Sequence, residues 1–131
     1  MKSDFFKFRV YVEDTDMFGI VYHANYLKIF ERARTEWLRK RGFHLTEMVK
    51  DDTNFVIRRA IIEYQSPAYL DDELMIETQA YSMGFCQMRF IQKMYNQFQK
   101  LLSEFEVEVV CVNAKMAPKR LPKEIAKELC V

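Results

Sequence analysis

The first residues of the chain alternate between apolar and polar, the period of two that predicts a half-buried strand. The apolar side of this strand would hold Phe6, Phe8, Val10 and Val12. From Glu13 to Gly19 the sequence EDTDMFG breaks the alternation with three acids, a hydroxyl and a glycine. Such residues favour turns. We therefore expect a strand that runs to Val12 and an acidic turn directly behind it.

Behind the turn the pattern changes to a helical period. At about 100° per residue, one face of this helix collects Tyr26, Ile29, Phe30, Ala33 and Trp37, and we expect that aromatic stripe to be core. The helix is predicted to begin between Tyr22 and Asn25 and to run to about Arg41. Gly42 is predicted to stop it, after a basic run that suits the negative end of the helix dipole.

Strand-like segments dominate the rest of the chain. Four stretches rich in β-branched and aromatic residues, separated by turn residues, cover 55–64, 74–84, 85–95 and 101–113. In the last stretch apolar residues alternate with Glu104, Glu106 and Glu108, as in a sheet with one covered and one wetter face. One strand, one long helix and about four antiparallel strands predict a single α+β domain over residues 1–131, with the helix covering one sheet face.

The composition argues against several classes of protein. With 131 residues, half of them hydrophobic, the chain is long enough to bury a core. A net charge of +1 argues against a nucleic-acid surface. No apolar run approaches the ~20 residues of a membrane helix, and the first residues lack the apolar core of a signal peptide. Cys86, Cys111 and Cys130 lack metal-ligand spacing, which indicates reduced thiols in a cytoplasmic protein.

Asp16 has two interpretations. Its carboxylate could lie near the helix N-terminus, where unpaired N–H groups favour negative charge and could also polarise a substrate carbonyl. Equally, Asp14, Thr15 and Asp16 could be ordinary turn and cap residues. His23, at the helix start, could pair with Asp16 for acid–base chemistry or could be a surface residue. No second histidine or cysteine stands at ligand spacing, so we expect no metal site.

Basic residues are scattered along the chain. Arg32 and Arg34 are expected to mark a solvated or interfacial edge of the helix. In the strand-rich part, several basic positions could together meet the phosphates of a ligand. These positions are Arg58, Arg59, Lys93, Lys119 and Arg120.

Two longer stretches are similar to a known family. The block VYVEDTDMFGIVYHANYL at 10–27 and the segment ERARTEWLR at 31–39 closely resemble the acyl-CoA thioesterases of the YbgC and 4-hydroxybenzoyl-CoA thioesterase group. IEY at 62–64, PA at 67–68 and PKRLP at 118–122 are similar as well, so the likeness covers nearly the whole chain. The resemblance implies a hotdog fold, in which an antiparallel sheet of about five strands wraps around one long central helix.

The resemblance also implies a reaction and a site. The reaction is hydrolysis of an acyl-CoA thioester to a free acid and CoA, without a cofactor. Asp16 corresponds to the catalytic aspartate, acting as nucleophile or general base, and a backbone N–H near His23 would hold the thioester carbonyl. Gly19 and Tyr22 are assigned to substrate binding, and the scattered basic residues are candidates for the CoA phosphates. Subunits of this family pair so that their sheets join, which implies a homodimer or a homotetramer with sites at the interface.

Two other functions stay open at this point. A hotdog dehydratase or hydratase would need a histidine and a carboxylate over the acyl β-carbon. A non-catalytic module would bind acyl-CoA or acyl-carrier protein without turnover, and acyl-carrier protein is also a second candidate carrier for a thioesterase. The acidic turn with its histidine favours the thioesterase. Met17 and Phe18, beside the presumed thioester, do not decide between short, long and aromatic acyl groups.

Overall fold

A computed structural model describes residues 3–130, so Met1, Lys2 and Val131 of the predicted domain lie outside the described residues. Helices, strands and one 3₁₀ turn, labelled η1, follow one another with short connections. Their bounds are β1 Asp4–Arg9, η1 Val12–Asp14, α1 Asn25–Lys40, α2 Leu45–Lys50, β2 Asn54–Tyr64, β3 Glu73–Ser82, β4 Gln87–Tyr95, β5 Leu101–Val112 and α3 Lys123–Ala126.

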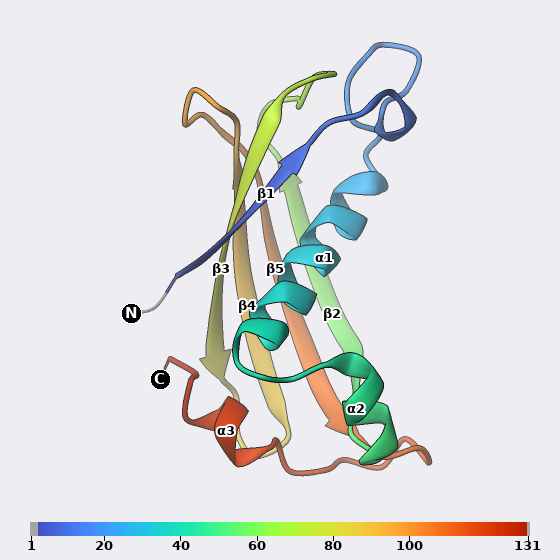
Figure 1. Ribbon diagram of the computed structural model, residues 1–131, viewed down its shortest axis with the longest axis vertical. Coiled ribbons are helices and arrows are strands. Elements are labelled where there is room, and N and C mark those ends of the chain that lie inside the picture. Colours follow the sequence, from blue (N-terminus) through green and yellow to red (C-terminus); the bar gives the residue numbers. More distant parts are fainter. Residues whose placement is uncertain (1–2, 131) are drawn as a thin grey trace.

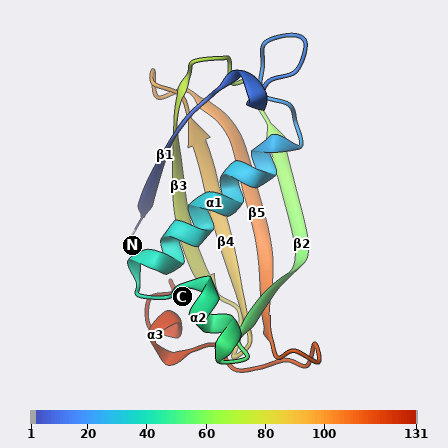
Figure 2. The same cartoon turned by 45° about the vertical axis from the view of Figure 1, so that its right-hand side comes forward.

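The strands form one antiparallel sheet in the order β1-β3-β4-β5-β2, and α1 crosses one of its faces (Figure 1). Figures 1 and 2 show the acidic turn and the start of α1 at one end of the sheet. The other end carries α2, α3 and the C-terminal tail. The prediction of an α+β fold, with a five-stranded antiparallel sheet and one long helix on one face, is confirmed.

The helix α1 ends where the sequence predicts. It runs from Asn25 to Lys40. Gly42 has a φ of +84°, which a glycine adopts without steric cost. The Phe43 N–H then turns back and donates to the Leu38 carbonyl at 3.0 Å. The Leu38 carbonyl thus accepts both the Phe43 N–H and the Arg41 N–H, and this closing turn marks the sharp end of α1.

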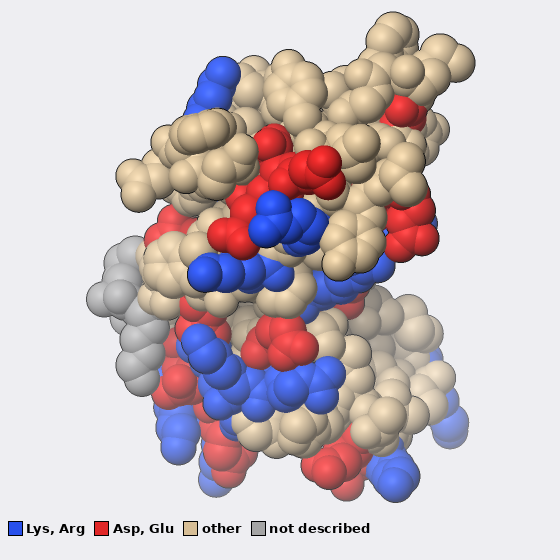
Figure 3. Space-filling model, turned by 45° about the horizontal axis from the view of Figure 1, so that its top comes forward, with Lys and Arg blue, Asp and Glu red and all other residues tan. Residues whose placement is uncertain are grey.

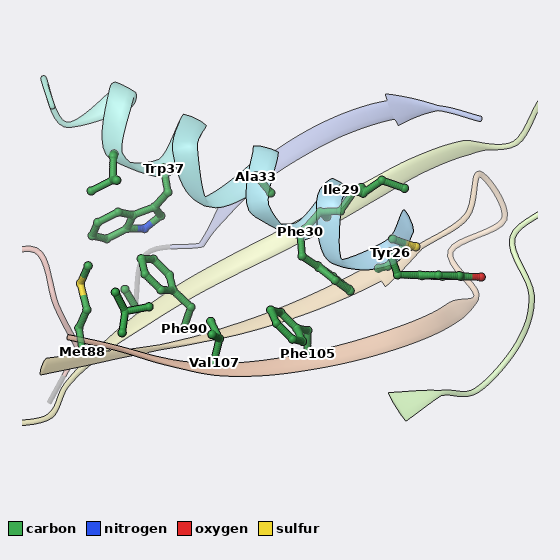
Figure 4. Packing of buried hydrophobic residues seen from close by; sticks show 14 of the residues in the cluster. Tyr26, Ile29, Phe30, Ala33, Trp37, Met88, Phe90, Phe105 and Val107 are labelled. Carbon is green, nitrogen blue, oxygen red and sulfur yellow. The ribbon is translucent and has the colours of Figure 1, made fainter. Parts of the chain in front are cut away.

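Aromatic side chains carry the contact between α1 and the sheet (Figure 4). Phe30 stacks on Phe105 of β5 with ring centroids 5.1 Å apart, and Trp37 meets Phe90 of β4 edge-on at 5.3 Å. All four side chains are buried. Because aromatic side chains bury about 150–250 Å² each, this row accounts for much of the packing that holds α1 on the sheet. The prediction that the aromatic stripe is core is confirmed.

The first strand is shorter than its alternation predicts. β1 ends at Arg9, and Val12, predicted on the buried side, lies in η1 with 74% of its surface exposed. The Tyr11 N–H donates to the Asp14 carboxylate at 2.9 Å. A short acidic side chain can capture a nearby backbone N–H in this way and compete with a strand ladder. The chain therefore turns before the strand can reach Val12.

Arg34 is buried, and the prediction that it marks a solvated or interfacial edge is wrong. Its exposed fraction is 6%, whereas Arg32 is exposed as expected. The Arg34 guanidinium donates to Gln92 Oε1 at 3.0 Å and pairs with Glu31. Gln92, itself buried, donates to the Phe30 carbonyl at 3.0 Å. Burial lowers the pKa of Arg34, while the charge of Glu31 opposes that shift. A polar network under α1 thus holds the charge.

The outer face of β5 carries one covered carboxylate. Glu104 and Glu106 are partly exposed, as the alternation predicts. Glu108 is only 7% exposed. Arg58 and Arg59 of the neighbouring β2 lie across it, with nitrogen–oxygen distances of 3.2 and 3.8 Å. The predicted wetter face is therefore correct for two of the three glutamates, and the third is covered by the two arginines.

The strand β2 forms a long edge of the sheet. It is 11 residues long, and only β5 pairs with it among the described residues. Ile57, Ile61 and Tyr64 along this edge have exposed fractions between 41% and 53%. A long edge strand with exposed apolar side chains is a template for pairing with another chain.

Candidate functional site

Asp16 begins a tight turn that fixes its side chain. Its N–H donates to the Ile20 carbonyl at 2.9 Å, and the Gly19 N–H donates back to the Asp16 carbonyl at 3.0 Å. Gly19 has a φ of +76°, so the turn needs a residue without a side chain at that point. The Asp16 Oδ1 accepts the Phe18 N–H at 2.8 Å. The carboxylate is half-buried and held in one orientation by the backbone of its own turn.

A second loop supports the turn from behind. The Gly19 carbonyl accepts the Leu70 N–H at 3.1 Å, and the Val21 N–H donates to the Ala68 carbonyl at 2.8 Å. Ala68 has no exposed surface and belongs to the PA pair at 67–68. That pair therefore lies directly against the site.

Asp14 and Thr15 are turn residues, in agreement with the second interpretation of the acidic cluster. The Asp14 carboxylate accepts the Tyr11 N–H, and the Thr15 hydroxyl donates to a carbonyl of η1 at 2.7 Å. The Asp14 carbonyl accepts the side-chain N–H of Asn25 at 3.0 Å. No side chain caps α1, so none of the acids, Asp16 included, fills the cap position at the helix start.

The start of α1 leaves several backbone N–H groups without a protein acceptor, as the first turn of a helix usually does. The Asn25 N–H donates to the Tyr22 carbonyl at 2.8 Å. Within residues 3–130, the N–H groups of His23 and Ala24, just ahead of the helix, donate to no other residue. Such groups carry partial positive charge at a helix start. They can bind a carbonyl oxygen on which negative charge develops.

Two tyrosine hydroxyls brace this region, and reasoning from the sequence missed both. The Ala68 N–H donates to Tyr26 Oη at 3.1 Å, and the Tyr64 hydroxyl donates to the His23 carbonyl at 2.9 Å. The two rings meet edge-on with centroids 5.1 Å apart. Tyr64 is the last residue of the IEY segment at 62–64, which is similar to the YbgC group. The sequence did not indicate its hydrogen bond to the His23 carbonyl.

The pKa values of both tyrosines are raised, chiefly by burial. Burial raises the pKa of Tyr26 most, the Ala68 N–H lowers it, and the charge of Asp16 is among the smaller causes that raise it. Burial also raises the pKa of Tyr64. Both phenols therefore stay protonated at neutral pH. Asp16 lies within electrostatic reach of the Tyr26 hydroxyl at the start of α1.

The ring of His23 is exposed and packs beside the ring of Tyr22, with centroids 4.6 Å apart. No hydrogen bond joins this imidazole to the Asp16 carboxylate within the part of the chain that the structure describes. His23 thus contributes its backbone to the geometry of the site, since its carbonyl is the acceptor for Tyr64.

The structure does not gather the predicted basic residues around the turn. Arg58 and Arg59 lie on β2 and pair with Glu108. Lys93 lies on β4 between Glu77 and Glu104 of the neighbouring strands. Lys93 faces away from α1, because the buried residues of β4 are the ones next to it on either side.

The segment between β5 and α3, which carries Lys119 and Arg120, lies at the opposite end of the sheet from the acidic turn (Figure 1). The Lys119 ammonium donates to the carbonyls of Asp51 and Asp52 at 2.8 and 3.0 Å and to the Thr53 hydroxyl at 3.1 Å. The positive charge of Lys119 therefore lies just after the C-terminal end of α2, where it complements the negative end of the helix dipole. Arg120 is exposed, with its guanidinium over the Phe85 ring.

A mostly apolar cavity of about 270 Å³ opens between α1, α2 and the first half of β2. Its polar lining consists of Glu31, Arg34, Thr35, Thr53 and Asn54. Its apolar wall includes Leu38, Leu45, Met48, Val49, Phe55, Ile57, Met88, Phe90 and Val109. The cavity lies toward the α2 end of the sheet, away from the turn of the same chain.

The surface around the turn is apolar at its tip and mixed in charge beside it. Met17 and Phe18 are 93% and 80% exposed, so neither is a core residue. Figure 3 shows acidic and basic side chains intermixed on the face toward this end. Among residues 3–130, no group of three or more potential ligands could hold a metal ion. No helix within that range is long and apolar enough to cross a membrane.

Residues 10–129 match the sequence pattern of the thioesterase-like superfamily. The chain belongs to this superfamily. The acyl-CoA thioester hydrolase YbgC of Escherichia coli O6:H1 is 47% identical over 121 residues, which cover 92% of this chain and 90% of that protein. The acyl-CoA thioesterase YbgC of Haemophilus influenzae is 43% identical over 122 residues, 92% and 89% of the two chains. The resemblance to the YbgC group is confirmed.

Solved structures agree on the fold. A probable thioesterase from Bartonella henselae superposes with a TM-score of 0.87 at 36% identity, covering 92% of this chain and all of that one. A 1,4-dihydroxy-2-naphthoyl-CoA thioesterase from Synechocystis reaches a TM-score of 0.92 at 20% identity, covering 98% and 96%. At that identity the second likeness concerns the fold alone. The predicted hotdog fold is confirmed.

Proposed function

We propose that this chain hydrolyses acyl-CoA thioesters to a free acid and CoA, with Asp16 as the catalytic carboxylate. One observation carries the proposal. The Asp16 carboxylate is fixed on a turn at the start of α1, where the N–H groups of His23 and Ala24 have no acceptor among residues 3–130. The likeness to the YbgC hydrolases supports the activity independently.

The chemistry needs a polarised carbonyl and an activated oxygen. The thioester oxygen accepts from the free N–H groups, which stabilise the negative charge that develops on attack. As a nucleophile, Asp16 bonds to the carbonyl carbon, and the C–S bond breaks with its electron pair leaving on the CoA sulfur. Water then cleaves the mixed anhydride. As a general base, Asp16 removes a proton from the water that attacks, and the same C–S bond breaks.

Free-thiol release from short, long and aromatic acyl-CoA thioesters, with matching acyl-carrier-protein thioesters, tests this proposal. Asp16→Asn keeps an acceptor for the Phe18 N–H but removes the charge, so kcat should fall by about 10²–10⁴-fold in a folded protein. Asp14→Asn is the matched control and should stay close to wild type. Hydrolysis near the wild-type rate by folded Asp16→Asn would refute the assignment. If the protein hydrolyses only the acyl-carrier-protein thioesters, its substrate is acyl-carrier protein and not acyl-CoA.

The chain is proposed to act as a homodimer, or as a homotetramer of two such dimers, joined through β2. The exposed apolar residues Ile57 and Ile61 on this long edge support pairing with a second copy. Antiparallel pairing can set Arg59 opposite Glu63 of the second copy, which matches opposite charges across the strands. A two-fold axis perpendicular to the sheet keeps both helices on the same face.

This pairing would complete the site. The two ends of β2 are about 33 Å apart at ~3.3 Å per residue, with Asn54 near the apolar cavity and Tyr64 near the start of α1. Antiparallel pairing places the Asn54 end of one copy beside the Tyr64 end of the other. The acyl group bound at the turn of one copy would then enter the cavity of the other copy.

The remaining parts of the proposal concern the surroundings of the site. Arg58, Arg59, Lys93, Lys119 and Arg120 stay candidates for the CoA phosphates, and Gly19 and Tyr22 for substrate binding. Lys119 is the weakest of these, since its ammonium already has three acceptors. A cytoplasmic location is supported by the free thiols of Cys86, Cys111 and Cys130, which fit a reducing compartment.

A further inference from the structure

Tyr64 reaches from the end of β2 to the peptide just ahead of α1. Its hydroxyl donates to the His23 carbonyl at 2.9 Å. Its ring is set edge-on against Tyr26, whose own hydroxyl is fixed by the Ala68 N–H. The donor is therefore aimed by contacts from α1 and from the loop after β2.

The acceptor of this hydrogen bond belongs to the peptide that carries the Ala24 N–H. An amide is conjugated, so a hydrogen bond to its oxygen draws electron density from its nitrogen and strengthens its N–H as a donor. The same bond prevents the peptide plane from rotating. The Ala24 N–H has no acceptor among the described residues, so it is available to a ligand.

We propose that Tyr64 is a positioning residue for thioester hydrolysis: its hydroxyl orients and polarises the His23–Ala24 peptide so that the Ala24 N–H binds the thioester oxygen. This inference rests on the proposed acyl-CoA hydrolysis. Tyr64 does not touch the substrate carbonyl in this role. It acts on the rate through the backbone of His23.

A packing role for the ring is the competing explanation, because Tyr64 also contacts Tyr26. The two explanations differ in what they require: packing needs only the ring of Tyr64, whereas the positioning role needs its hydroxyl. Tyr64→Phe keeps the ring and removes the donor. The loss of one neutral hydrogen bond should lower kcat roughly three- to tenfold. Tm and the KM for acyl-CoA should stay close to wild type.

Tyr69→Phe is the matched control. Tyr69 lies on the supporting loop with 54% of its surface exposed, and its hydroxyl bonds to no residue within 3–130. It should leave both kcat and KM unchanged. An unchanged kcat in Tyr64→Phe, or a loss of kcat that only follows a loss of Tm, would overturn the inference.

A spectroscopic measurement tests the polarisation itself. A ketone analogue of acyl-CoA, with a CH₂ group in place of the thioester sulfur, binds without turnover. Its carbonyl stretch should shift to lower frequency on binding to wild type, and Tyr64→Phe should lose part of that shift. Fluorinated tyrosines at position 64 are stronger donors and, while protonated at mildly acidic pH, should raise kcat with the number of fluorines. An equal shift in both proteins would contradict the role of the hydroxyl.

The experiments distinguish this inference from the function on which it rests. If wild-type protein releases no thiol, or folded Asp16→Asn is fully active, the proposed function fails. If wild type is active, Asp16→Asn is not, and Tyr64→Phe equals wild type, the role of Tyr64 fails alone.

Discussion

The guanidinium of Arg41 lies over the indole ring of Trp37, with its central carbon 3.8 Å from the ring centre. The same group donates to the Trp37 carbonyl at 2.9 Å and pairs with Asp4 at 2.6 Å and with Glu128 at 3.3 Å. The side chain of Arg41 is 8% exposed. One buried cation thereby joins β1, the end of α1 and the segment after α3.

Arg41→Met should lower the free energy of unfolding by about 3–5 kcal/mol, because it leaves the carboxylate of Asp4 buried without its partner. Urea denaturation measures this difference. Arg39→Met is the matched control, since Arg39 pairs with Glu36 on a half-exposed surface and should change stability by about 0–1 kcal/mol. If both variants lose a similar free energy of unfolding, the ion pairs of Arg41 contribute no more than a surface ion pair.

Gly19→Ala should lower stability and hydrolysis together. At a φ of +76° a side chain costs about 1–2 kcal/mol, and relief of that strain would move the Asp16 carboxylate. A displacement of this kind should reduce kcat about tenfold or more. Gly84→Ala imposes similar strain at a φ of +100° in the β3–β4 turn, so it should lower Tm without lowering kcat. If Gly19→Ala and Gly84→Ala lower kcat equally, the turn at Asp16–Gly19 has no special role in hydrolysis.

Mixed dimers should recover activity that neither parent variant has. Asp16→Asn disables the turn, and Thr35→Trp fills the cavity that Thr35 lines. If the acyl group of one copy enters the cavity of the other, one of the two sites in a mixed dimer is intact. Each mixed dimer should therefore regain about half of the wild-type activity, and an evenly co-expressed pool, in which about half of the dimers are mixed, about a quarter.

Thr46→Trp is the control for this experiment, because Thr46 is exposed on α2 and does not line the cavity. It should keep full activity. A mixed dimer that stays inactive, with each parent folded and dimeric, would show that turn and cavity work within one chain.

Alkaline pH should weaken the fold through Tyr26. Its pKa is raised in the folded protein, chiefly by burial, above the ordinary value of about 10. The folded state therefore holds its proton longer than the unfolded state. Its contribution is fully present below pH ~10 and is lost as pH rises through the folded pKa. Urea denaturation across this range should show a smaller loss for Tyr26→Phe than for wild type and Tyr69→Phe; identical slopes would exclude Tyr26 as the cause.

Local patterns predicted the elements that local physics controls. The helix end near Arg41 followed from the apolar period and from Gly42, both of which act within a few residues. The alternation of β5 was equally visible in the sequence. Asp16 was singled out by the resemblance, since the turn pattern alone left it equivalent to Asp14.

Contacts between distant segments could not be predicted in this way. The burial of Arg34 depends on Gln92, which is 58 residues away in the sequence, and the bond from Tyr64 to His23 spans 41 residues. The strand prediction failed at Val12 for a different reason. There the Asp14 side chain competes with the ladder, and apolar alternation does not register such competition.

The hydrogen bonds of Lys119 link the segment after β5 to the connection between α2 and β2. α2 has only six residues, and the carbonyls of Asp51 and Asp52 directly after it accept hydrogen bonds from a side chain of the segment behind β5. Leu45, Met48 and Val49 of this same helix form one wall of the apolar cavity. The loop at 113–118 lies directly ahead of Lys119, so an insertion there should displace this lysine and loosen α2 against the cavity. If the cavity holds the acyl group as proposed, the insertion should change acyl selectivity although it lies outside the cavity lining.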